Sequence, residues 1–102
     1  MPLSSKERAA LRAEAHRLTA TVHVGHHGVT DAVRQSLDDD LRTHELVKIQ
    51  FTKTADVTVK DAANDLARAI GADVVQVIGR TATLFRENPE LEKKDDSPPW
   101  RR

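Results

Sequence analysis

The apolar residues of this chain recur with two alternating spacings, and the order of these spacings is the strongest restriction on its fold. The spacing is helical in three segments, namely residues 4–18, 30–44 and 56–70. Ser4 and Glu7 form a capping box before the first segment, Thr30 is suited to cap the second, and Gly71 is suited to end the third. Three amphipathic helices are therefore expected.

Between the helices the pattern becomes that of β-strands, in residues 21–25, 46–51, 73–78 and 81–85. Gly79 and Arg80 read as a two-residue hairpin turn between the last two strands. The sequence therefore predicts an α/β fold in which an N-terminal helix precedes β-α-β-α-β-β, with a four-stranded mixed sheet packed against helices. We expect the first helix on one face of the sheet and the two crossover helices on the other. Because residues 73–78 are almost all apolar, we expect them to form a central strand.

Length and composition restrict the class of protein. The 102 residues suit one domain, which we assign to residues 1–86, followed by a flexible charged tail at 87–102. There is no cysteine, no apolar run long enough for a membrane span and no signal-peptide pattern, so we expect a cytoplasmic protein. We expect no cofactor. The net charge is zero, yet the first 28 residues carry four bases against two acids, with Lys6, Arg8, Arg12 and Arg17 against Glu7 and Glu14.

The segment Gly25-His26-His27-Gly28 joins the first strand to the second helix. Two glycines allow close approach of a backbone, and the N-terminus of a helix presents free N–H groups that suit a phosphate. The same G-x-x-G spacing also fits an ordinary tight turn. Local evidence leaves these two interpretations level.

The wider sequence resembles a known family. The stretches LSSKERAALRAEAHRL, VHVGHHGVTDAV, HELVKIQF and GADVVQVIGRTATLFR occur in the order found in the CRM domain, in particular in the small YhbY-like proteins of bacteria. The resemblance covers residues 3–86 and departs from the family mainly in the two histidines, because relatives often have lysine or small polar residues between the glycines.

This resemblance implies an RNA-binding protein that associates with large-subunit ribosomal precursors as an assembly factor. It also implies a fold similar to the C-terminal domain of translation initiation factor three, and RNA contact through the G-x-x-G loop. The expected RNA-binding residues are the loop, the basic first helix placed beside it, and two further bases: Gly25, His26, His27, Gly28, Lys6, Arg8, Arg12, Arg17, Lys48 and Arg80. With few aromatic residues, recognition should depend mainly on phosphates, 2′-hydroxyls and RNA shape.

Two other classes of function stay open. His23, His26 and His27 are conceivable ligands of a catalytic metal, although adjacent loop side chains tend to diverge. A basic helix also suits an adaptor that binds an acidic protein. No nucleophile or carboxylate pair has a recognisable setting, so we expect a monomeric protein that binds RNA, is not an enzyme and holds no metal.

Overall fold

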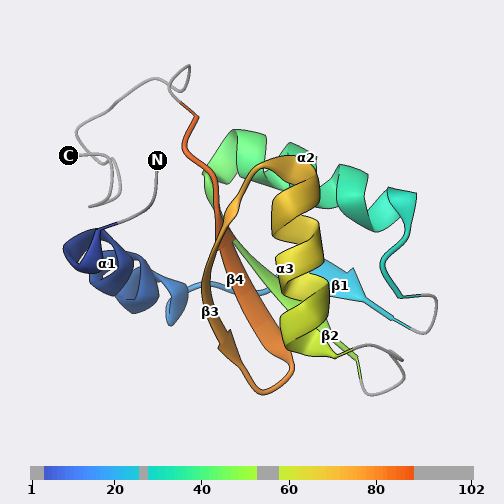
Figure 1. Cartoon of the computed structure of the whole chain (residues 1–102), viewed down its shortest axis with the longest axis horizontal. Helices are drawn as coiled ribbons and strands as arrows, with labels where there is room; N and C mark the ends of the chain where they lie inside the picture. Colours follow the sequence, from blue (N-terminus) through green and yellow to red (C-terminus); the bar gives the residue numbers. More distant parts are fainter. Residues whose placement is uncertain (1–3, 26–27, 53–57, 89–102) are drawn as a thin grey trace.

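The computed structural model describes residues 4–25, 28–52 and 58–88, which form three helices and four strands in the expected order (Figure 1). In chain order the elements are α1 (Ser5–Ala15), β1 (Val22–Val24), α2 (Asp31–His44), β2 (Leu46–Phe51), α3 (Val59–Ile70), β3 (Asp73–Ile78) and β4 (Thr81–Phe85). The predicted α/β class and the order helix, then β-α-β-α-β-β, are confirmed.

Local capping residues determine where the helices begin and end. The Ser4 hydroxyl accepts from the Glu7 N–H at 3.1 Å, and a Glu7 carboxylate oxygen accepts from the Ser4 N–H at 3.1 Å. These bonds complete the capping box, and the Ser4 N–H holds the pKa of Glu7 below its ordinary value. Thr30 caps α2 by accepting from the Val33 N–H at 3.2 Å, and Gly71 ends α3 with φ 70°. All three predicted signals are confirmed.

The four strands form one sheet in the order β1-β2-β4-β3. The β1–β2 pair is parallel and joined by α2, whereas β4 pairs antiparallel with both β2 and β3. The expectation that residues 73–78 form a central strand is wrong, because the hairpin inserts β4 between β2 and β3. As an edge strand, β3 buries Val75 but leaves Ile78 54% exposed, while β4 buries its last four residues.

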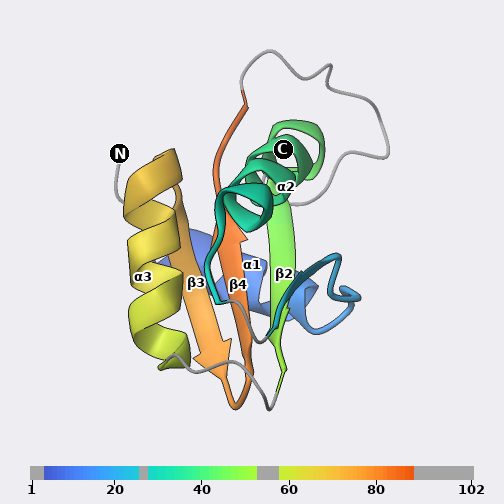
Figure 2. The ribbon, with the colours of Figure 1, turned by 90° about the vertical axis from the view of Figure 1, so that its right-hand side faces the viewer.

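The helices cover both faces of this sheet unequally. α2 and α3 cover one face, and Figure 2 shows both on the same side of the strands. The main core lies there, and its fully buried members include Val24, Leu37, Leu41, Ile49, Phe51, Leu66 and Leu84. α1 lies on the other face, where Leu11 packs with Leu46, Val75 and Phe85. The expected division of the helices between the two faces is confirmed.

The chain leaves β4 through a cluster of polar contacts. One Arg86 nitrogen donates to the Asp38 carboxylate at 2.6 Å and to the Ile70 carbonyl at 2.9 Å, and the other donates to the Asp38 carbonyl at 3.1 Å. The Arg86 guanidinium also lowers the pKa of Asp38. Two residues on, the Asn88 N–H donates to the buried Glu45 carboxylate at 2.6 Å. Residues 89–102 of the expected tail lie outside the described residues.

Candidate nucleic-acid interface

The G-x-x-G segment is a turn at the end of β1. The Gly28 N–H donates to the Gly25 carbonyl at 2.9 Å, which closes a four-residue turn immediately before the Thr30 cap of α2. Gly28 has φ 70°, in the left-handed region that favours glycine. His26 and His27 lie outside the described residues, so their expected contact with RNA stays a prediction.

The two glycines of this turn have different reasons to be glycine. Gly28 needs its positive φ for the turn itself. Gly25 has no such backbone conformation, and a Cβ added there would meet nothing closer than the Thr52 Oγ1 atom at 3.9 Å, an ordinary van der Waals distance. The fold would therefore accept a side chain at Gly25. With glycine at this position, no Cβ covers the backbone that follows β1.

The end of β2 and the β3–β4 hairpin lie next to this turn. The Thr52 N–H donates to the Val24 carbonyl at 2.9 Å, and the Phe51 N–H donates to the Arg80 carbonyl at 2.7 Å. The Arg80 guanidinium in turn donates to the Thr52 carbonyl at 3.1 Å. Thr52 thus connects Arg80 to Gly25. The sequence could not indicate this role, because Thr52 belongs to no recognisable motif. We call this end of the sheet, where β1, β2 and β3 finish, the loop end.

Lys48 and Arg17 lie on the sheet face opposite α2 and α3. The Lys48 ammonium donates to the Leu18 carbonyl at 3.4 Å, and the Thr21 N–H donates to the Lys48 carbonyl at 3.2 Å. Arg17 is exposed immediately before Leu18, in the segment that leads from α1 to β1. Lys48 and Arg17 are therefore close together where the segment between α1 and β1 passes β2.

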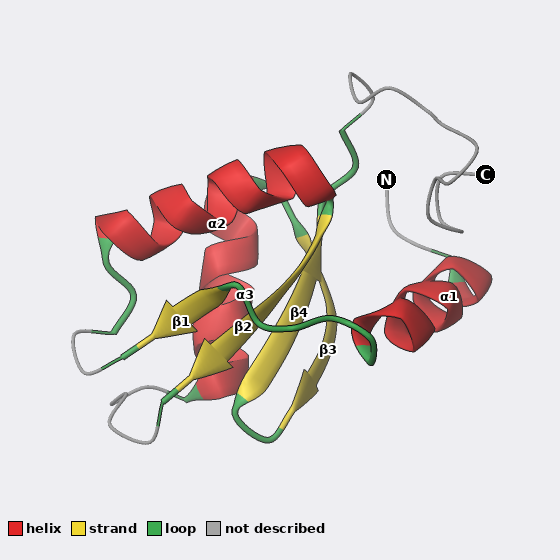
Figure 3. Ribbon diagram, turned by 180° about the vertical axis from the view of Figure 1, so that it is seen from behind, coloured by secondary structure: helices red, strands yellow, loops and turns green. Residues whose placement is uncertain are grey.

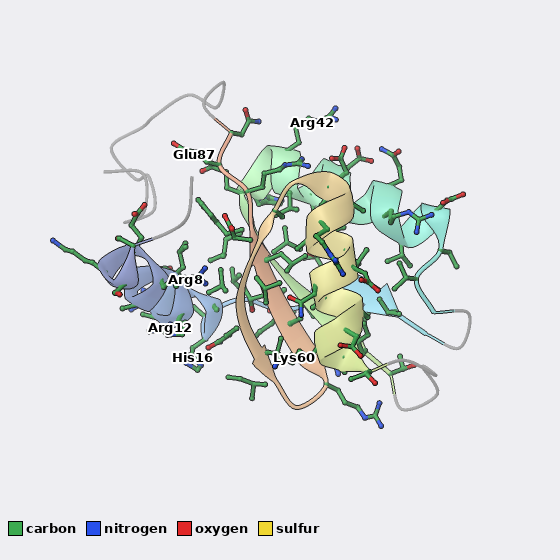
Figure 4. The ribbon with its side chains drawn as sticks, in the orientation of Figure 1. Arg8, Arg12, His16, Arg42, Lys60 and Glu87 are labelled. Carbon is green, nitrogen blue, oxygen red and sulfur yellow. The ribbon has the colours of Figure 1, made fainter. Side chains whose placement is uncertain are left out.

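The expectation that α1 lies beside the loop is wrong. α1 packs against Leu46 and Phe85, which are at the start of β2 and the end of β4, the opposite end of the sheet. The Arg8 guanidinium donates to the Val74 carbonyl near the start of β3 at 3.0 Å. Figure 4 shows Arg8 and Arg12 on α1, on the far side of the sheet from β1. Lys6, Arg8 and Arg12 are therefore separated from the Gly25–Gly28 turn.

Acidic residues gather on the helices of the other face. α2 carries four aspartates, Asp31, Asp38, Asp39 and Asp40, against Arg34 and Arg42. In α3, Asp61 and Asp65 are balanced by Lys60 and Arg68. A molecule with zero net charge therefore has a net negative charge on α2 and the Arg80 cation at the loop end.

Three histidines, His23, His26 and His27, are the conceivable metal ligands in the sequence. In the part of the chain that the structure describes, no group of three or more His, Asp or Glu side chains is placed to hold a metal ion. His23 is exposed on β1, and its two expected partners, His26 and His27, lie outside that part. None of the described helices is long and apolar enough to cross a membrane.

The sheet order, the three helices and the glycine turn together define a small α/β domain with a Gly25–Gly28 turn between β1 and α2. The model of the CRS1/YhbY (CRM) domain family matches residues 3–86, so the chain belongs to this family. The similar proteins include one from Bacillus subtilis named "Probable RNA-binding protein YqeI", 32% identical over 86% of this chain and 92% of the relative. A Haemophilus influenzae protein named "RNA-binding protein" is also 32% identical, over 86% of this chain and 89% of its own length.

A solved structure supports the same fold. The solution structure of a hypothetical protein from Staphylococcus aureus, described as a candidate RNA-binding protein, has a TM-score of 0.76 and 28% identity. The match covers 89% of this chain and 95% of the Staphylococcus aureus protein. The α/β arrangement is therefore shared over nearly the whole length of both proteins. The expected likeness to the C-terminal domain of translation initiation factor three stays a prediction.

Proposed function

We propose that this protein binds RNA at the loop end of its sheet and acts on large-subunit ribosomal precursors as an assembly factor. Membership of the CRM family and the names of the relatives support RNA as the ligand. The observation that carries the proposal is Gly25 close to Arg80 through Thr52, because a backbone without a Cβ next to a guanidinium suits a phosphate. The ribosomal role rests on the resemblance alone, whereas the cytoplasmic location and the monomeric state stay expectations from the sequence.

The positive charge for this site comes from side chains more than from the helix dipole. α2 begins directly after the turn, but Asp31 is in its first turn and pairs with Arg34. That carboxylate offsets much of the partial positive charge at the N-terminus of the helix. Phosphates are therefore bound mainly by Arg80, Lys48 and Arg17, beside the backbone of Gly25.

Binding of this kind depends on salt. Three engaged cations release about three counterions, so log K should fall against log salt with a slope of roughly −2 for single-stranded RNA. Losing one of the cations should weaken binding similarly for all RNA sequences, since phosphate contacts carry little base information. No step of this function needs catalysis or a cofactor.

The test compares Arg80→Gln with Arg68→Gln. Both arginines are exposed, but Arg68 is on α3 and pairs with Asp65 at 2.7 Å, away from the loop end. Arg80→Gln should reduce RNA affinity about 5-fold and make the salt slope shallower by about 0.7, whereas Arg68→Gln should change neither. Equal losses in both variants, or binding that does not respond to salt, would contradict the proposal.

The cellular role needs a separate experiment. RNA crosslinked to the protein in cells should be enriched in large-subunit ribosomal RNA. A scatter over messenger RNAs would remove the assembly role while leaving RNA binding intact. If an acidic protein bound more tightly than RNA, with a steeper salt dependence, the protein would be an adaptor instead.

A further inference from the structure

Four side chains form a row across the sheet at its loop end. The strand register pairs His23 with Gln50, Gln50 with Thr81, and Thr81 with Ile78. All four point away from α2 and α3, because their strand neighbours, such as Val24, belong to the main core. With neighbouring strands about 4.8 Å apart, this open row is about 14 Å long.

No element covers this row in the described part of the chain. α1 reaches only Leu46, Val75 and Phe85, at the opposite end of the same face. The segment between α1 and β1 crosses the face at the level of Lys48 and Thr83, where Thr83 is 1% exposed (Figure 3). One row nearer the loop end, His23 is exposed, Ile78 is 54% exposed, and Gln50 and Thr81 between them are half-buried.

The chemistry of the open row suits a base. The Gln50 amide donates to the Phe51 carbonyl at 3.4 Å, a long bond that leaves this amide weakly held. The Thr81 hydroxyl donates to the Ile78 carbonyl at 2.8 Å, so its oxygen is oriented to accept. Amide and hydroxyl groups can pair with the polar edge of a base, and the apolar Ile78 side chain can contact its flat face.

Position and charge favour RNA as the occupant of this surface. His23 is two residues before Gly25, and the Arg80 carbonyl accepts from the residue after Gln50, so the row is continuous with the proposed phosphate site. The two rows nearest the loop end contain Lys48 and no carboxylate. A polyanion on these two rows therefore meets no negative side chain of the strands.

We propose that the open row binds an unpaired nucleotide of the RNA whose backbone is held at the Gly25–Gly28 turn. This inference rests on the proposed function and adds the class of RNA to it. In a duplex the base edges are paired and lie within the grooves, where a flat sheet face cannot reach them. The protein should therefore prefer single-stranded RNA over a duplex of the same sequence.

Isoleucine methyl NMR tests contact with the row directly. The chain has three isoleucines, and only Ile78 is on the open face; Ile49 is fully buried and Ile70 packs against the main core. A short single-stranded RNA should shift the Ile78 methyl signal upfield, because a base lies over it, and should leave Ile49 and Ile70 nearly unchanged. If the RNA saturates the protein and Ile78 does not respond, the inference is wrong.

Matched variants test the energetics. Gln50→Ala and Ile78→Thr should each weaken binding of the single strand about 3- to 10-fold and leave binding of the duplex unchanged, the effect expected of one lost neutral contact. Gln35→Ala is the control, since Gln35 is exposed on acidic α2 and pairs there with Asp39. Thr at position 78 keeps a β-branched side chain, so the strand should be preserved.

The outcomes separate this inference from the function on which it rests. Salt-dependent RNA binding that is equal for single strand and duplex, and equal in wild type and both variants, would overturn the inference and keep the proposed function. Failure to bind either RNA would overturn both. An Ile78 signal that moves with protein concentration in the absence of RNA would assign the face to contact between two copies, and would also overturn the inference.

Discussion

Replacing each glycine of the turn by alanine should separate its role in folding from its role in binding. Gly28 has φ 70°, and a side chain in this region costs about 1–2 kcal/mol. Gly28→Ala should therefore lower the midpoint of thermal unfolding by roughly 5–15 °C, given about 4–8 °C per kcal/mol for a domain of this size. Gly28→Asn should cost less, because asparagine tolerates the left-handed conformation better.

Gly25→Ala should give the opposite pattern. Its added methyl group would be 3.9 Å from the Thr52 Oγ1 atom and would meet no strain, so stability should stay the same or rise slightly. If an RNA phosphate approaches the backbone here, the methyl group must displace it and lengthen a charge-assisted hydrogen bond. Such a bond is worth about 1.5–3 kcal/mol, so affinity should fall by roughly 10- to 100-fold.

Two measurements check this pair of variants. Circular dichroism gives the unfolding midpoint, and fluorescence anisotropy of labelled RNA at one fixed salt concentration gives the affinity. If the Gly25→Ala variant binds RNA as tightly as the wild type, RNA does not approach this backbone closely. If Gly25→Ala lowers the unfolding midpoint as much as Gly28→Ala does, the distinction between a binding role for Gly25 and a folding role for Gly28 is refuted.

Three further predictions concern stability, pH and metal. Arg86→Gln should lower the free energy of unfolding by about 2 kcal/mol in urea, because it breaks the bonds to Asp38 and Ile70. The pKa of Asp38 is lowered in the fold, so this stabilisation is present above the ordinary pKa of about 3.9 and is lost as pH falls through the folded value. The free energy of unfolding of Arg86→Gln should therefore change less with pH in the acid range than that of the wild type. An unchanged pH profile would contradict the role of Arg86 in lowering the pKa of Asp38. RNA affinity should rise as pH falls from about 8 to 6, since phosphate favours protonated imidazole, and His26→Gln/His27→Gln should remove that rise. Chelators should change neither RNA affinity nor unfolding temperature; stoichiometric zinc that is lost in His26→Ala would favour the metal site instead.

Local sequence signals predicted the elements because the energies that define them are local. The Ser4–Glu7 capping box and the αL glycine at position 71 each depend on residues within one helical turn, and both are found where expected. The two-residue turn at Gly79 and Arg80 is also local, and Gly79 has φ 56°. Signals of this kind fix where elements begin and end, but they do not fix which strands pair.

The two wrong expectations concern contacts between distant segments. The apolar run of residues 73–78 indicated burial, but the hairpin allowed β4 to take the inner position beside β2. The apolar face of α1 indicated that it packs, without indicating on which end of the sheet. One signal could have placed it: Leu46 points to the same face as Lys48 and Gln50, so an apolar partner was needed at the start of β2.

The position of α1 also explains why zero net charge does not exclude RNA. Because α1 lies at the opposite end of the sheet, Lys6, Arg8 and Arg12 are away from the proposed site. The positive charge of this site therefore comes from Arg80, Lys48 and Arg17. Exposed charges more than about 8–10 Å apart are largely screened at physiological salt, and Asp38, Asp39 and Asp40 are two or more helical turns beyond the start of α2. Asp31 is at that start, next to the turn, but it pairs with Arg34. A phosphate at the Gly25–Gly28 turn therefore responds mainly to the nearby cations. The distribution of charge over the two faces, which only the fold determines, decides whether this chain can bind a polyanion.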